Sequence, residues 1–259
     1  MIKTFQEIIY SYYAQYGRDF PFRENISPYH VVFSEIMLQQ TQTGAVSEKF
    51  LNFIHLFPDF EALANAPLKK VLKAWQGLGY NKRAIGLQKT AKLIVKEHDG
   101  EVPKSRKTLE TLPYIGKATS GSILAFAFNK PEPFIETNIR RVFIYFFFPA
   151  KKKVSDADIL PLVEKTLDRE NPREWYYALM DYGVMLKKRH PELTKRSSKY
   201  RKQKPFKGSN REIRGKLLKS FLSGEGLTEE QVLQKLPFDA KRIKKVLKQL
   251  IKEGFIRRE

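Results

Sequence analysis

Residues 112–119, which read Leu-Pro-Tyr-Ile-Gly-Lys-Ala-Thr, constrain the fold of this chain more than any other segment. They predict two helices joined by a tight hairpin. Pro113 ends the first helix because its ring removes a backbone donor and restrains the preceding residue. Gly116 allows the positive φ that such a turn tends to need. The free N–H groups of residues 117–119 then open the next helix, and the positive end of its dipole suits a phosphate.

A second segment, residues 135–141, places the carboxylate of Glu136 near the paired cations Arg140 and Arg141. A phosphate site close to a lone acid would suit an enzyme that acts on a nucleotide inside DNA, with Arg140 as a DNA contact. Taken alone, the first segment also fits an ordinary packing corner between two helices, and the acid of the second fits a solvated surface residue. Both interpretations stay open on these residues alone.

The charge of the chain favours a nucleic-acid partner. The 259 residues hold 48 Lys and Arg against 28 Asp and Glu, a formal net charge of +20, and such an excess attracts polyanions. The sequence has no cysteine, which excludes disulfides, thiolate metal sites and thiol nucleophiles, and we expect no metal site. It shows no signal-peptide core and no apolar run of the roughly 18 residues that a spanning helix needs. We therefore expect a cytoplasmic, nucleoid-associated protein without a membrane partner, acting as a monomer.

Glu35 is the only charge in the run from Val31 to Thr41, which is otherwise apolar or amide-bearing apart from Ser34 and Thr41. Glutamate is seldom fully buried unless it is paired or functional, and burial would raise its pKa toward the range of a general acid. The alternative is that Ser34 caps a helix and Glu35 only complements its dipole. The amides of Gln39 and Gln40 could probe base edges or fill a gap in the base stack.

Helical periodicity dominates the chain and strand alternation is scarce, which predicts an all-α fold. The expected helices, punctuated by Pro and Gly, cover residues 3–16, 29–40, 42–56, 59–65, 67–75, 81–97, 105–111 and 117–128. The strand-like run from Phe143 to Phe148 follows Arg141 without a breaker, so we expect it to be the buried end of a helix.

Residues 187–207 change in character, because basic side chains dominate and apolar ones almost vanish. We expect a basic linker that contacts the DNA backbone, with Lys199 and Arg201 among the contacts. The alternative is a solubilising spacer.

Residues 208–259 predict three short helices, at 210–222, 228–236 and 239–253, in the order of a helix-turn-helix or winged-helix-like module. Asp239 should cap the last helix, whose exposed face would carry five basic residues: Lys241, Arg242, Lys244, Lys245 and Lys248. The chain stops where a wing hairpin would begin, and three-helix modules of this kind also bind proteins.

Taken together, these segments resemble the helix-hairpin-helix DNA glycosylase superfamily, specifically its adenine glycosylase (MutY-type) branch. The resemblance runs from about residue 16 to residue 185. Besides the hairpin, it rests on four runs: 34–41 (SEIMLQQT), 63–68 (LANAPL), 75–80 (WQGLGY) and 180–183 (MDYG).

The resemblance implies an enzyme that flips a base out of duplex DNA and hydrolyses its N-glycosidic bond. Glu35 matches the acid that protonates the purine, and Glu136 stands where the family carries an aspartate that stabilises the sugar cation. Asn138 matches an asparagine near the sugar. The residues matching those that wedge into the duplex are Gln39, Gln40 and Tyr80. The hairpin would hold the phosphate backbone, with room for a monovalent cation, through Leu112, Tyr114, Gly116, Lys117, Ala118 and Thr119.

The chain departs from the family pattern in its site. Glu136-Thr137 replaces Asp-Gly, and Tyr114 replaces the first glycine of the hairpin. Ala118 occupies the position of the Schiff-base lysine of the lyase branch, which implies a monofunctional glycosylase, while Lys117 is about 100° away around a helix. Asn81 and Phe22 replace a family tyrosine and tryptophan.

Two larger parts of the family pattern are also missing. The four cysteines that hold an iron–sulfur cluster are absent, with Lys187 at the position of the first, so we expect a clusterless member without a cofactor. The resemblance would also imply a larger C-terminal domain that recognises 8-oxoguanine, but residues 208–259 are too few to form it, which leaves the opposing base open.

We therefore expect a two-lobed helix-hairpin-helix glycosylase core. Residues 20–130 would form one lobe, 1–19 and 131–186 the second, 187–207 the linker and 208–259 the C-terminal module. The expected reaction is removal of a mismatched adenine, opposite guanine or 8-oxoguanine, from duplex DNA. The alternatives are a thymine or uracil mismatch glycosylase and a non-catalytic DNA-binding or damage-sensing protein.

Overall fold

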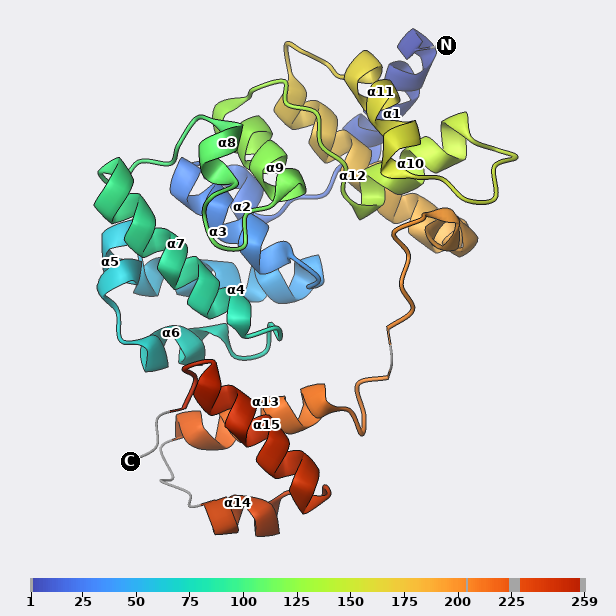
Figure 1. Cartoon of the computed structure of the whole chain (residues 1–259). Coiled ribbons are helices and arrows are strands. Elements are labelled where there is room, and N and C mark those ends of the chain that lie inside the picture. Colours follow the sequence, from blue (N-terminus) through green and yellow to red (C-terminus); the bar gives the residue numbers. More distant parts are fainter. Residues whose placement is uncertain (1, 204, 224–228, 257–259) are drawn as a thin grey trace. The chain divides into compact units, whose positions relative to one another are not determined.

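The computed structural model describes residues 2–203, 205–223 and 229–256, which form helices joined by loops (Figure 1). Among these residues the only strand-like pairing is an isolated bridge between Val154 and Ser197. The prediction of an all-α fold is therefore confirmed. Two compact units divide the chain: one combines residues 1–66 with 82–200, the other 67–81 with 201–259.

The first unit contains two sets of packed helices. The first set comprises α2 (Pro21–Glu24), α3 (Pro28–Leu38), α4 (Thr43–Leu56), α5 (Phe60–Asn65), α7 (Lys82–His98), α8 (Arg106–Leu109) and α9 (Lys117–Phe128). The second comprises α1 (Ile2–Tyr16), α10 (Thr137–Phe147), α11 (Asp156–Thr166), α12 (Pro172–Arg189) and the 3-10 helix η1 (Pro191–Arg196). The two sets meet where α9 packs against α12. Helix α1 packs against α11 and α12, so the first helix of the chain lies beside segments that are far from it in sequence (Figure 1).

Each set has its own aromatic core. In the first, Phe33 and Phe53 are fully buried with ring centroids 4.4 Å apart. In the second, Phe5 of α1 lies edge-on to Phe143, at 5.5 Å, and to Trp175, at 5.7 Å. The phenylalanine-rich run does end a helix, since α10 reaches Phe147, but only its first part is buried: Phe143 is buried, whereas Tyr145 is 40% exposed.

Local sequence explains where several helices begin. Ser27 accepts a hydrogen bond from the backbone N–H of His30, and Pro28 occupies the first turn of α3, where its missing donor costs nothing. Ser155 and Asp158 form a reciprocal capping box at the start of α11. The first of these caps fixes the start of α3, which contributes to the cavity described below.

Residues 187–207, expected to be a linker, begin inside α12 and continue into η1. Leu193 is buried, and the Arg196 guanidinium donates to the carbonyls of Phe148, Pro149 and Lys151. The first half of this segment is therefore folded onto the first unit. The expected linker residue Lys204 lies outside the described residues.

The second unit contains α6 (Leu68–Trp75), α13 (Asn210–Ser223), α14 (Glu229–Lys235) and α15 (Ala240–Lys252). Its apolar core is built from residues of α13, α14 and α15 together with Ile256. Asp239 caps α15 by accepting from the backbone N–H of Arg242, as expected. The three expected helices of this module are thus present, although Thr228, the first residue expected in the second of them, lies outside the described residues, as does Arg257. The described residues of the module form no wing hairpin.

Candidate active site

A cavity of about 840 Å³ lies in the first unit, between the two sets of helices. Its lining includes seven of the residues singled out from the sequence: Glu35, Gln39, Gln40, Ala118, Thr119, Glu136 and Asn138. The structure therefore brings these seven residues to one cavity, although they come from three separate helices and their flanking turns.

Glu35 projects from α3 into this cavity, where Ser122 of α9 donates a hydrogen bond of 2.5 Å to its carboxylate. Burial raises the pKa of Glu35 to about 7, and the nearby negative charge of Glu136 acts in the same direction. The Ser122 hydrogen bond and the positive charge of Arg23 oppose this rise. A carboxyl group with this pKa can carry a proton near neutral pH and give it up, as a general acid must.

Glu136 caps the N-terminus of α10. One of its carboxylate oxygens accepts hydrogen bonds from the backbone N–H groups of Asn138, at 2.6 Å, and Ile139, at 2.9 Å. Burial raises the pKa of Glu136, while these two N–H groups and the Arg141 and Arg140 cations lower it. The carboxylate is thus held by main-chain donors, and its second oxygen receives only a longer contact, 3.3 Å from the Asn138 amide nitrogen.

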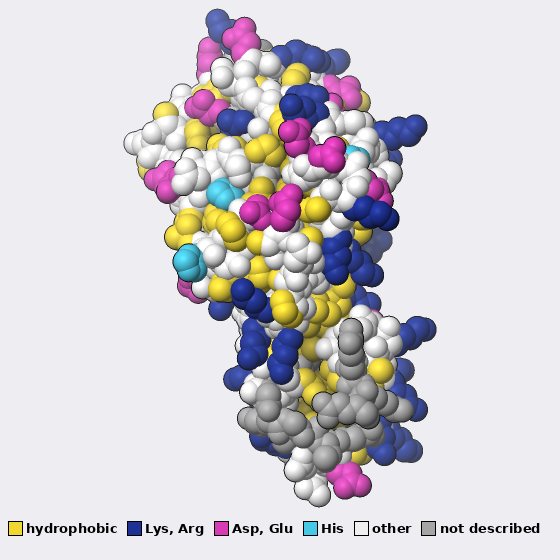
Figure 2. All heavy atoms as spheres, turned by 90° about the vertical axis from the view of Figure 1, so that its left-hand side faces the viewer, with side chains coloured by type: hydrophobic (Ala, Val, Ile, Leu, Met, Phe, Trp, Pro, Cys, Tyr) yellow, Lys and Arg dark blue, Asp and Glu magenta, His cyan; other side chains and the backbone are white. Residues whose placement is uncertain are grey.

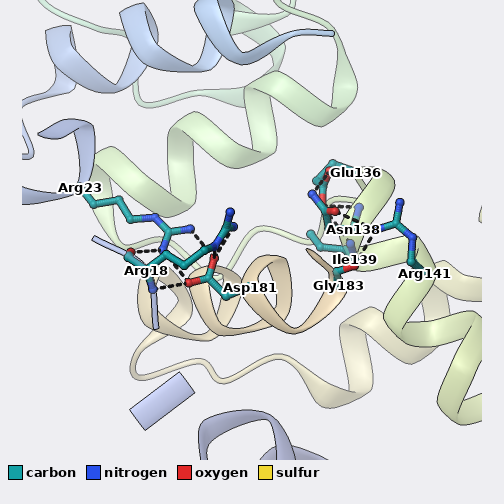
Figure 3. A network of polar contacts seen from close by, with 8 residues as sticks. All are labelled: Arg18, Arg23, Glu136, Asn138, Ile139, Arg141, Asp181 and Gly183. Carbon is teal, nitrogen blue, oxygen red and sulfur yellow. Dashed lines mark hydrogen bonds and ion pairs between the residues drawn. The ribbon is translucent and has the colours of Figure 1, made fainter. Parts of the chain in front are cut away.

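Arg141 fixes the orientation of Asn138. Its guanidinium donates to the Asn138 side-chain oxygen at 2.8 Å and to the Gly183 carbonyl at 2.6 Å (Figure 3). A Cβ at Gly183 would lie 2.5 Å from the Asn138 carbonyl oxygen, so α10 and α12 can approach this closely only with glycine there.

The most extensive polar network beside the cavity was missed from the sequence. Asp181 of α12, only 2% exposed, receives hydrogen bonds from both Arg18 and Arg23 (Figure 3). The Arg23 guanidinium also lies over the ring of Tyr177, 4.3 Å from its centroid. Because more than 150 residues separate Asp181 from both arginines, no local pattern marks the network, although Asp181 lies in the run 180–183 on which the family resemblance rests.

Gln39 connects the cavity to the hairpin. Its side-chain nitrogen donates to the Tyr114 carbonyl at 2.8 Å and to the Thr119 hydroxyl at 3.2 Å. Gln40, exposed and with φ of 55°, lies at the rim. Arg83, also missed from the sequence, is buried and donates to the Ile36 and Met37 carbonyls at the end of α3. It thereby fixes the turn that carries both glutamines.

The hairpin differs from the prediction in one respect. The residue with positive φ is Tyr114, at 64°, whereas Gly116 has φ of −99° and serves as the N-cap of α9. Tyr114 fits because its ring lies against α7 at Gly86, where an added Cβ would stand 2.0 Å from a ring carbon. Buried Leu112 anchors the hairpin, and Gly116 has no side chain to cap the N–H groups that open α9.

The remaining predicted DNA contacts lie apart from the cavity lining. Lys117 and Lys199 are exposed. Arg140 forms a two-pronged ion pair with Asp156, at 2.6 and 3.0 Å, so its guanidinium is already engaged. Tyr80 and Arg201 belong to the second unit, where the Tyr80 hydroxyl is hydrogen-bonded to Gln203. DNA contact by these residues stays a prediction.

The chain cannot supply the ligands of an iron–sulfur cluster, because its sequence has no cysteine. Among the described residues, no group of three or more His, Cys, Asp or Glu side chains is placed to hold a metal ion. None of the described helices is long and apolar enough to cross a membrane.

Comparison with known proteins identifies the family. Residues 33–164 match the model of the HhH-GPD superfamily base excision DNA repair proteins. The adenine DNA glycosylase of Buchnera aphidicola subsp. Baizongia pistaciae (strain Bp) is 35% identical over 188 residues, covering 71% of this chain but only 53% of that protein. The adenine DNA glycosylase of Mycobacterium tuberculosis (strain CDC 1551 / Oshkosh) is 30% identical over 239 residues, covering 83% and 77%.

Solved structures agree on the fold. A thermostable thymine-DNA glycosylase superposes with a TM-score of 0.67 at 27% identity, covering 71% of this chain and 86% of that one. A trapped endonuclease III–DNA covalent intermediate superposes with a TM-score of 0.57 at 19% identity, covering 79% and 89%, which supports the fold alone. The chain therefore belongs to the HhH-GPD superfamily of base excision DNA repair proteins, on its adenine DNA glycosylase branch.

Proposed function

We propose that this protein is a monofunctional DNA N-glycosylase that removes a mismatched adenine from duplex DNA. The observation that carries the proposal is Glu35, a carboxyl group with a pKa of about 7, in the same cavity as the main-chain-held carboxylate of Glu136. A module that only bound DNA would have no use for a buried acid, because burying a carboxylate that is held by a single hydroxyl is costly.

In the proposed reaction, protonated Glu35 donates its proton to a ring nitrogen of the flipped adenine. The C1′–N bond then breaks, its electron pair leaves with the base, and positive charge develops on the sugar. Ionised Glu136 faces that charge and stabilises it. Water adds to C1′ and loses a proton, which completes hydrolysis. Asn138, oriented by Arg141, would position the sugar.

The walls of the cavity suit a flat base. Phe20 stacks on Phe22, with ring planes 9° apart, and Phe126 stacks on Tyr177, with planes 17° apart. All four residues line the cavity. The Arg23 guanidinium lies over the rings of Phe20 and Tyr177, so the wall offered to a flipped base is both aromatic and cationic. Such a wall compensates in part for the stacking that a base loses when it leaves the duplex. The uncapped N–H groups that open α9 would bind the DNA backbone, with or without a monovalent cation.

Ala118 in the cavity lining supports a monofunctional enzyme, because a methyl group cannot form a Schiff base with the sugar. Lys187 also contributes to the lining from α12 and is exposed. We expect borohydride treatment during turnover to trap no covalent complex.

We further propose that the protein acts without an iron–sulfur cluster, as a monomer on the DNA of the nucleoid in the cytoplasm.

Thymine or uracil opposite guanine is a second candidate substrate, because a thymine-DNA glycosylase is 27% identical to this chain and superposes with a TM-score of 0.67. The same two carboxylates and stacked aromatic walls could hold a pyrimidine, although a cavity of about 840 Å³ leaves room for the larger purine.

Single-turnover base release from a panel of duplexes tests the proposal. The panel holds adenine opposite guanine, 8-oxoguanine, cytosine and thymine, and also thymine and uracil opposite guanine. We expect adenine release by the wild type and none by Glu35→Gln, with duplex affinity retained. Release of only thymine or uracil would move the protein to the second candidate function. No release from any duplex, with tight binding retained, would make it a DNA-binding or damage-sensing protein.

A further inference from the structure

The second unit carries a one-sided stripe of lysines on α15. Lys241, Lys244, Lys245, Lys248 and Lys252 are all exposed. At about 100° per residue they fall within an arc of about 100°, over a length of about 16 Å. The residues that α15 buries, Ile243, Val246, Leu247 and Leu250, lie on the opposite side of the helix and pack into the core of the unit.

No carboxylate of α15 or its caps is available to neutralise this stripe. Asp239 is the N-cap and accepts from the helix backbone, and Glu253, at the C-terminal end, forms an ion pair with Arg214 at 2.5 Å. Residues 201–259 as a whole hold 17 Lys and Arg against 7 Asp and Glu. On the face drawn in Figure 2, the surface of the second unit likewise shows mainly Lys and Arg among its charged side chains.

The stripe is held in place within its unit. Arg242, on the flank of the helix, donates to the Gly208 carbonyl at 2.8 Å and to the Asn210 side-chain oxygen at 2.9 Å. Together with the apolar face and the Arg214–Glu253 pair, these bonds fix α15 against α13. A fixed row of cations loses less conformational entropy on binding a polyanion than a flexible tail would.

The side chains also indicate what kind of contact the stripe can make. Arginine and glutamine read base edges through paired hydrogen bonds of fixed geometry, whereas lysine, which can also contact guanine, is a point charge with rotatable donors that suits phosphate. Arg242 is engaged with Gly208 and Asn210, and the Gln249 amide donates to Glu253. The exposed lysines at the centre of the stripe, Lys241, Lys245 and Lys248, can then bind phosphates, and such contacts carry no sequence information.

We propose that the lysine stripe of α15 is a second DNA-binding site, which grips the phosphates of duplex DNA without sequence preference. A helix whose charged face is about 16 Å long can lie along a groove of the duplex with its lysines toward the phosphates. The choice of DNA among polyanions rests on the proposed function, since the catalytic cavity would act on the same duplex. This site is separate from the cavity, and nothing in it depends on whether a base is released.

The test compares two triple variants that lose the same charge. Lys241→Gln, Lys245→Gln and Lys248→Gln remove the centre of the stripe, and Lys244 at its edge is retained. The control, Lys3→Gln, Lys96→Gln and Lys165→Gln, changes three exposed lysines of the first unit. Glutamine and lysine have similar helix propensities, so both variants should fold, and circular dichroism checks this.

The readout is the affinity for an undamaged duplex as a function of salt. Each phosphate contact contributes about 0.9 to the slope of log affinity against log salt, so the stripe variant should lose about 2.7 of that slope. When salt rises from about 50 to 200 mM, the duplex affinity of the stripe variant should then fall about 40-fold less than that of the wild type. The control should keep the wild-type slope. An unchanged slope in the stripe variant, or an equal loss in the control, overturns the proposal.

Lysine acetylation followed by mass spectrometry supplies an independent check on the wild-type protein. Undamaged duplex should protect Lys245 and Lys248 and leave Lys3, Lys96 and Lys165 reactive. Equal protection by polyglutamate, or stronger protection by RNA, would reject duplex DNA as the occupant. Because no base is released in either experiment, failure of the proposed glycosylase activity would leave both results interpretable.

Discussion

The Ser122 hydroxyl lies 2.5 Å from the Glu35 carboxylate and donates to it from α9. The same helix opens with the N–H groups that the hairpin exposes, so one rigid element supports both the proposed acid and the proposed phosphate site. A neutral hydroxyl stabilises the carboxylate less than a cation would, which leaves the pKa of Glu35 about 7 instead of low.

Base release should therefore depend on pH in a way set by Glu35. Because the protonated acid is the active form, the single-turnover rate should fall about tenfold per pH unit above about pH 7. On the acidic side, the rate should fall as Glu136 takes up a proton, at a pH above the usual range of a glutamate because burial raises its pKa. A rate that is flat across the alkaline range would remove Glu35 from the role of general acid.

Ser122→Ala should move the alkaline limb of this profile to higher pH. The hydrogen bond from Ser122 lowers the pKa of Glu35, so its loss leaves burial less opposed, and a shift of up to about one pH unit is expected. Ser120→Ala is the matched control, because Ser120 donates to Glu110 and to the Lys117 carbonyl instead. Equal shifts in the two variants would mean that the effect comes from α9 as a whole.

Two substitutions at Glu136 should separate its cap from its charge. Glu136→Gln keeps an oxygen that can accept from the Asn138 and Ile139 N–H groups, so stability should change little while base release falls about 100-fold or more. Glu136→Ala should lose about 1 kcal/mol of stability in addition. Denaturant unfolding and single-turnover kinetics measure the two effects, and full activity in Glu136→Gln would limit this residue to helix capping.

Asp181→Asn should destabilise the first unit by about 3 kcal/mol, since it leaves two guanidinium groups facing a neutral amide. Asp19→Asn removes an exposed charge next to Arg18 and should stay within about 0.5 kcal/mol of the wild type. Thermal unfolding compares the two. If both variants melt together, the network is dispensable for the fold.

Gly86→Ala should displace the hairpin, because its new Cβ would stand 2.0 Å from the Tyr114 ring. We expect a loss of about 2 kcal/mol and weaker duplex binding. The double variant Gly86→Ala with Tyr114→Gly should recover stability, since glycine also accepts the positive φ. Gly215→Ala, in a helix with open space around it, should instead be stabilising by about 0.5–1 kcal/mol. No recovery in the double variant would rule out the ring contact as the cause.

The sequence predicted those features that depend on local spacing. Helix positions followed from apolar periodicity, and the bounds expected for the helix after the hairpin, 117–128, are those of α9. Glu35 stood out because one charge interrupts an apolar run, and Asn138 and Glu136 because the family motif places them. All three line one cavity.

Features formed by distant segments could not be predicted in this way. The bonds from Arg18 and Arg23 to Asp181 join α12 to the segment after α1, and Ser122 meets Glu35 across 87 residues. The division of the chain shows the same limit, because residues 67–81 cluster with 201–259 although they follow α5 in sequence. The domain boundaries expected from the sequence stay a prediction.

The contact between Tyr114 and Gly86 restricts the order in which this hairpin can change. With the ring seated against α7, a side chain at position 86 and a tyrosine at position 114 exclude each other. A lineage moving from glycine to tyrosine at 114 must therefore already carry glycine at 86. Positions 86 and 114 are therefore expected to change together in evolution. Judged by position 114 alone, this hairpin would be taken for a defective one, although the glycine at 86 compensates for the tyrosine.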